Sequence, residues 1–143
     1  MKKKFWGEYV SIPYKDLIEL IKTNKVNLGI VDDLAQKITL SGSTTKSIRY
    51  ANIIWNLFGF GIFVLSIYFS ITLNWYLFIF GFFIWYKIYK INKKSNSENI
   101  LAQAQVDKDF YEKIRKINGW IYNTDIEIAK KYKIKNGYPF EES

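Results

Sequence analysis

The middle of the chain carries no charged residue from Tyr50 to Tyr86, between Arg49 and Lys87. Apolar and aromatic side chains fill nearly every position there, without the polar face that a helix on the surface of a soluble protein shows. A bilayer core needs roughly 20 apolar residues per helix, so the stretch is too long for one span. The pattern predicts two transmembrane helices joined by a tight turn.

We expect this hairpin to divide the chain into three parts, and the predicted fold class is a mostly α membrane protein. The expected segments are an N-terminal cytoplasmic arm over 1–46, a hairpin over 47–91 and a helical cytoplasmic tail over 92–143. Within the hairpin the expected elements are a helix over 47–71, a turn over 72–74 and a helix over 74–91. Lys87 and Lys90 fall near the end of the second helix, where long side chains reach the headgroups.

The N-terminal arm alternates helix and strand signals. Pro13 followed by an apolar stripe predicts a short amphipathic helix that ends near Thr23. Residues 26–31 and 38–40 are rich in β-branched and apolar side chains, and we expect them to form a small β-hairpin. The arm is therefore expected to be α with short β elements.

The tail contains two capping-box patterns, in which a Ser or Thr precedes a Glu by three residues. Ser95 with Glu98 predicts a helix that continues to about Ile117, where Asn118 and Gly119 follow. Thr124 with Glu127 predicts a second helix over 125–135.

Small and polar residues fall on one face of the first membrane helix at spacings of three and four. Their expected role is helix packing, together with one glycine of the second helix: Asn52, Asn56, Gly59, Ser66, Ser70 and Gly81. A turn at 72–74 would place Gly81 near Ser66, and Trp85 near Gly59 or Gly61. Three uses of this face are open: packing within the hairpin, contact with another copy, and a water-lined pore.

Aromatic and apolar residues also recur in the tail. The residues expected to carry the cytoplasmic contact are Phe110, Tyr111, Ile114 and Trp120. With Phe5 and Trp6 of the N-terminal arm, they are expected to form a joint core, the alternative being contact with the membrane surface.

The net charge of +8 is shared by both arms, because the hairpin between them is neutral. Basic residues that flank the hairpin and are expected to bind anionic lipid headgroups are Lys46, Arg49, Lys87, Lys90, Lys93 and Lys94. The turn has none, so the positive-inside rule places both termini in the cytoplasm, most simply at a bacterial cytoplasmic membrane. Nucleic acid is not an expected partner.

The chain contains no cysteine and no histidine, which excludes thiolate and imidazole chemistry. Asp107, Asp109 and Glu112 alternate with lysines and an arginine, as on a solvated helix face. No phosphate-binding glycine loop or nucleophile motif occurs. We therefore expect neither enzymatic activity, nor a cofactor, nor a metal site.

These observations predict a membrane-anchored interaction, accessory or immunity-type protein whose cytoplasmic arms bind a protein partner or further copies of the chain. The alternative is an oligomerising membrane-active effector, such as a holin-like pore former. A third hypothesis is a sensor whose lysines bind a nucleotide or anionic lipid.

Overall fold

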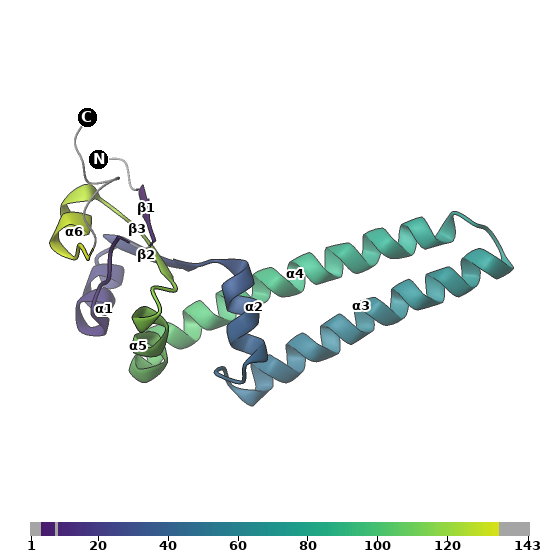
Figure 1. Ribbon diagram of the computed structural model, residues 1–143, viewed down its shortest axis with the longest axis horizontal. Coiled ribbons are helices and arrows are strands. Elements are labelled where there is room, and N and C mark those ends of the chain that lie inside the picture. The colour runs from purple at the N-terminus through teal and green to yellow at the C-terminus, as the bar shows by residue number, and fades with distance from the viewer. Residues whose placement is uncertain (1–3, 8, 135–143) are drawn as a thin grey trace. The chain divides into compact units, whose positions relative to one another are not determined.

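The computed structural model describes residues 4–7 and 9–134, which form six helices and three strands (Figure 1). The protein is mostly helical and contains one small sheet. The chain divides into two compact units. The globular unit comprises Met1–Leu34 and Ile100–Ser143, and the helical unit comprises Ala35–Asn99.

Antiparallel strands in the globular unit join its N-terminal part to its C-terminal part. They are β1 (Lys4–Trp6), β2 (Val26–Ile30) and β3 (Trp120–Thr124), in the order β1-β3-β2. The central strand, β3, comes from the C-terminal part, and both of its neighbours come from the N-terminal part. The two arms therefore share one sheet, as expected for arms that pack together.

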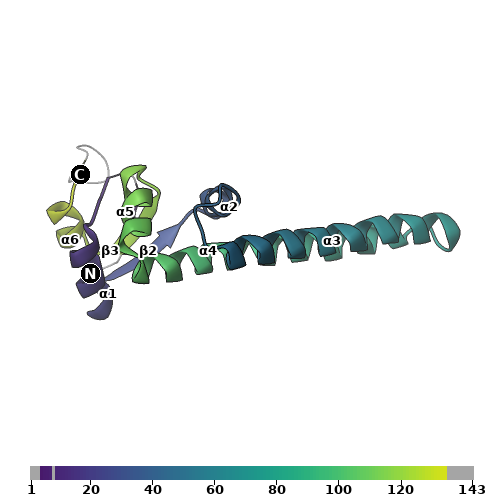
Figure 2. The same cartoon turned by 90° about the horizontal axis from the view of Figure 1, so that it is seen from below.

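Three helices surround these strands: α1 (Tyr14–Lys22), α5 (Lys108–Lys116) and α6 (Ile126–Lys131) (Figure 2). Helix α1 follows Pro13 and buries Leu17, as the sequence predicts. Helix α5 begins at Asp107, whose carboxylate accepts a hydrogen bond of 3.0 Å from the backbone N–H of Phe110. It ends before Asn118, whose φ of 52° turns the chain away from the helix.

Two tyrosines and a tryptophan form the centre of the globular core. The hydroxyl of Tyr111 donates to the carbonyl of Ile12 at 2.6 Å and lies 2.9 Å from the hydroxyl of Tyr122. The indole N–H of Trp120 donates to the carbonyl of Tyr111 at 3.0 Å, and the two rings stack. Burial raises the pKa of both tyrosines above the ordinary value, so both hydroxyls stay protonated.

The helical unit contains two long helices that lie side by side and run in opposite directions (Figure 1). They are α3 (Lys46–Thr72) and α4 (Leu77–Val106), and the shorter α2 (Asp32–Leu40) precedes them. The last residues of α4 and the first of α2 belong to the globular unit. A short turn between Thr72 and Leu77 connects the long helices.

One helix, α3, is long and apolar enough to cross a membrane, and only 11% of its most apolar window is buried. Helix α4 does not meet the same criterion among the described residues. Its uncharged part runs from Leu77 to Tyr86, ten residues that span about 15 Å, or half of a bilayer core. A single spanning helix is thus supported by length and composition, whereas the predicted transmembrane hairpin is not shown.

The predicted β-hairpin over 26–31 and 38–40 is wrong in its second strand. Residues 38–40 belong to α2, in which Ala35, Ile38 and Thr39 are buried at helical spacing. The acidic pair at the start of α2 favours a helix through the positive end of its dipole. The first strand exists as β2, but it pairs with β3 instead.

The predicted helix start at Ser95 is also wrong, because α4 passes through this position without a break. Local capping residues occur within helices as well, and here the helix ends later, before Asp107. Strand β3 was not predicted, since its pairing partners lie far away in the sequence. The last helix is shorter than the predicted 125–135, because it ends at Lys131 and Lys133 then pairs with Val10 in an isolated β-bridge.

Replacing Tyr111 with Phe should destabilise the globular unit by about 1–3 kcal/mol, because the carbonyl of Ile12 loses its buried donor. Near-ultraviolet circular dichroism during chemical unfolding of the full chain in mild detergent measures the change. An unfolding midpoint equal to that of the wild type would contradict the assigned bond.

The same tyrosine makes stability depend on pH. The unfolded chain releases the Tyr111 proton near pH 10, whereas the folded chain retains it, because burial raises the pKa. Its contribution is therefore complete below about pH 10 and is lost as the pH rises further. The Tyr111→Phe chain should show a shallower alkaline loss of stability than the wild type.

Candidate functional site

The candidate site is the contact between α3 and α4, where polar groups are buried between the two long helices. Asn56 donates from its side-chain amide to the Oδ1 atom of Asn52, one helical turn earlier, at 2.7 Å. Asn52 itself is only 1% exposed. The pair thus places two amides on the face of α3 that meets α4.

Helix α4 contributes Asn92 to this contact. Its side-chain Nδ2 donates to the backbone carbonyl of Asn52 at 3.1 Å, and the Asn92 side chain is buried. The net contribution of one such hydrogen bond is modest, about 0.5–1.5 kcal/mol. The bond therefore fixes the register of α3 against α4 more than it adds stability.

Two buried amide groups at this end of the helical unit have a donor without a hydrogen-bond partner. They are the Nδ2 atoms of Asn52 and Asn96, on α3 and α4 respectively. Both residues are at most 2% exposed. Since an unpaired buried donor costs about 1–3 kcal/mol, this end of the helix pair favours an additional acceptor.

Farther along the contact, glycines allow α3 and α4 to approach each other closely. A Cβ atom at Gly59 would lie 3.2 Å from atoms of Trp85 and of Ile88. A Cβ atom at Gly81 would overlap the side chain of Ser66. Both glycines are buried, so the face with small residues is occupied within one copy of the chain.

Serine hydroxyls on α3 bond within their own helix. Ser66 donates to the carbonyl of Phe63 at 2.6 Å, and Ser70 donates to the carbonyl of Ser66 at 2.9 Å. The ring of Phe63 stacks on Trp85 with 5.5 Å between the ring centres. Gly61, in contrast, has no atom of another residue within reach of an added Cβ.

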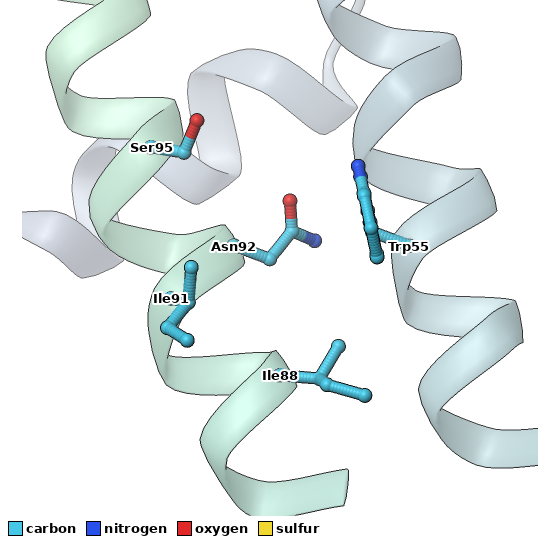
Figure 3. Close-up of a pocket in the computed structure, with 5 residues that line it drawn as sticks. All are labelled: Trp55, Ile88, Ile91, Asn92 and Ser95. Atoms are coloured by element: carbon cyan, nitrogen blue, oxygen red, sulfur yellow. The ribbon is translucent and has the colours of Figure 1, made fainter. Parts of the chain in front are cut away.

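A groove of about 320 Å³ opens beside this contact, within the helical unit (Figure 3). Trp55 of α3 forms one wall. The opposite wall belongs to α4 and consists of Ile88, Ile91, Asn92 and Ser95. The groove therefore extends from the buried Asn92 to the outer surface of the helix pair.

The expected cytoplasmic contact residues lie inside the globular unit. Phe110, Tyr111, Ile114 and Trp120 are all buried there. Tyr111 reaches the N-terminal part through Ile12, so these residues join the two arms to each other. Their side chains are not on the surface of the unit.

The six basic residues expected at the headgroups all lie on α3 and α4. Four of them are exposed, namely Lys46, Lys87, Lys90 and Lys94, and two are half-buried, namely Arg49 and Lys93. Arg49 lies over the ring of Tyr50. Lys94 is 3.9 Å from Glu98 in a pair open to solvent, which contributes little to stability.

Residues 4–7 and 9–134 contain no group of three acidic side chains close enough to hold a metal ion. Sequence reasoning missed Asn92, Ser95 and Asn96 as site residues, because it ended the second membrane helix at residue 91. The four-residue spacing of Asn92 and Asn96, which matches that of Asn52 and Asn56, was the signal that could have indicated them.

Replacing Gly81 with Ala should weaken the contact of α3 with α4 by about 1–3 kcal/mol, because the new methyl group overlaps Ser66. The matched control is Gly61→Ala, which adds the same methyl group to α3 where nothing lies in its way. Thermal unfolding of both variants in mild detergent, followed by far-ultraviolet circular dichroism, compares them. Equal unfolding temperatures would contradict this packing.

The chain was also compared with known proteins. No protein-family model, curated protein sequence or solved structure matches it. Any functional conclusion therefore depends on the physical properties of the two units.

Proposed function

We propose that the protein is a membrane-anchored interaction protein, with its helical unit in the bilayer and its globular unit in the cytoplasm. Exposed apolar surface is the observation that carries this proposal. Along α3 only Asn52 and Gly59 are buried, while large apolar residues such as Leu57 and Ile71 are exposed, the latter at 81%. In water such a surface would aggregate, whereas lipid solvates it.

The position of the polar groups supports the same conclusion. In the helical unit Asn52 and Asn92 are buried at the helix contact while most phenylalanines are exposed, the reverse of a soluble protein. Asn52 and Asn92 bond to groups of the unit itself, which limits the cost of placing them in hydrocarbon.

We further propose that α4 crosses the membrane beside α3 and completes a hairpin. Its uncharged part is short, but Lys87 and Lys90 can extend their side chains to the headgroups. The helix up to Ile91 can therefore lie within the bilayer. Local thinning of the bilayer accommodates the remaining mismatch. Contacts at both Gly59 and Gly81 support α4 as the neighbour of α3 along this length.

The globular unit is the part available for a protein partner. Its strands and helices hold both ends of the described chain in one fold, and large apolar side chains such as Val106 and Ile117 are exposed on it. An accessory or immunity-type role in a membrane complex fits an anchored module of this kind. The alternative, a pore-forming effector, needs polar groups that line water, whereas Asn52 and Asn92 are buried between helices.

Two lysines in the middle of α3 should prevent stable membrane insertion. Phe60 and Val64 are exposed and one turn apart, and each Lys at the bilayer centre costs about 2.5–3.5 kcal/mol. We expect the Phe60→Lys/Val64→Lys chain to move from the alkali-resistant membrane fraction to the soluble or aggregated fraction. Immunoblotting of the fractions measures this.

The control places the same substitution on the globular unit. Val106 is 83% exposed there, and the Val106→Lys chain should fractionate as the wild type does. If the double variant stayed in the membrane fraction as fully as this control, α3 would not be an anchor.

Single cysteines test the second crossing, since the chain has none of its own. If α4 crosses, Lys25→Cys and Val106→Cys should both resist an impermeant maleimide in intact cells, while Asn74→Cys should react. If α3 alone crosses, the cysteines at 74 and 106 should lie on the same side of the membrane and react alike with the maleimide. The cysteine at 25 should then show the opposite behaviour. The second pattern would overturn the hairpin and keep the anchor.

A further inference from the structure

The groove between α3 and α4 has a polar end and an apolar end. Figure 3 shows the indole nitrogen of Trp55, the amide of Asn92 and the hydroxyl of Ser95 toward one end. Ile88 lies toward the other end. A ligand that fits this groove has both a hydrogen-bonding part and a hydrocarbon part.

The apolar and polar ends follow one another along α4 in the same order as the hydrocarbon core and the headgroups in the proposed membrane placement. Ile88 lies next to the uncharged segment of α4, and Ser95 lies beyond the last lysine of the basic segment, Lys94. The apolar end thus lies nearer the hydrocarbon and the polar end nearer the headgroups. A phospholipid placed in the bilayer has the same polarity.

Positive charge lies beside the groove. Lys87, Ile91 and Lys94 follow one another at spacings of four and three residues, which puts both lysines on the side of α4 that carries Ile91. Both lysines are exposed, and Ile91 is 69% exposed at the edge of the groove. Glu98 lies 3.9 Å from Lys94, so this edge holds two lysines and one carboxylate, and its net positive charge favours a negatively charged headgroup.

The polar end is also rich in donors. The ring N–H of Trp55, the hydroxyl of Ser95 and the lysine ammonium groups all donate. Asn52, whose backbone carbonyl accepts from Asn92, does not line the groove, but its buried Nδ2 atom is a further donor without a partner next to Asn92 in the hydrogen-bonded contact. Phosphate oxygens, which only accept, are the matching chemistry.

We propose that this groove binds one anionic phospholipid, with its phosphate near Trp55, Ser95 and the two lysines and an acyl chain along Ile88 and Ile91. The proposal rests on the proposed membrane insertion of the helical unit. It adds a defined site to the general attraction between basic residues and the membrane surface.

The test is native mass spectrometry of the full chain in mild detergent, titrated with phosphatidylglycerol or with phosphatidylcholine of the same acyl chains. We expect one phosphatidylglycerol molecule to bind first and to saturate before further lipids bind. Phosphatidylcholine should bind more weakly, because its choline group neutralises the headgroup. Glycerol 3-phosphate, which has the phosphate without the chains, should not compete.

Two variants locate the site. Lys87→Gln/Lys94→Gln should weaken the first binding step by roughly tenfold to thirtyfold, since each lysine near an anionic headgroup contributes about a fivefold gain. Ile91→Trp should abolish that step by filling the groove, and its exposed position leaves the helix contact unchanged. The control is Lys90→Gln. Lys90 neighbours Lys87 and Lys94 but lies about 100° round the helix from Ile91, against about 40° and 60° for the other two lysines, so its loss should weaken binding less than the paired change does.

Equal binding of the two lipids, or equal losses in Lys90→Gln and Lys87→Gln/Lys94→Gln, would overturn the site. Competition by glycerol 3-phosphate would also overturn it, because it would show a phosphate site without a lipid chain. Membrane fractionation of the same wild-type chain distinguishes failure of the lipid site from failure of the proposed function. If the chain fractionates with the membrane but binds no saturable lipid, the lipid site is wrong and the membrane anchor stands.

Discussion

The helical unit buries amide groups and exposes hydrocarbon, and this reversed distribution constrains everything else about it. A helix pair with phenylalanine and isoleucine on its outer side has no stable state in water without a cover. In a bilayer the lipid supplies no hydrophobic drive between the helices, so they associate through close packing and hydrogen bonds. The contact at Gly59, Gly81, Asn52 and Asn92 has this composition.

Small and polar residues on α3 serve the contact in different ways. Gly59 receives the ring of Trp85 and the side chain of Ile88, while Ser66 meets Gly81. Asn52 joins α4 through its carbonyl group, at the end of the contact where the groove opens. The stripe is therefore occupied within one copy, which leaves the groove and the apolar outer face as the surfaces for lipid or partners.

The globular unit depends on long-range pairing. Strand β3 lies between two strands from the other end of the chain, and Tyr111 bonds to Ile12 across almost 100 residues of sequence. The helical unit is inserted between these two parts of the chain. The arms must therefore come together after the segment between them has been made, and the membrane helices then keep both arms on one side in the proposed topology.

Local patterns in the sequence were sufficient to predict the uncharged segment, the helix α1 and the face that Asn52 and Gly59 share. Each depends on length or helical period, which short-range chemistry determines. Strand β3, the helical state of residues 38–40 and the continuity of α4 through Ser95 depended on partners distant in sequence, which can override local capping and strand propensity. The groove likewise arises only when Trp55 and Ser95 meet across two helices, so the tertiary structure alone decided where a ligand fits.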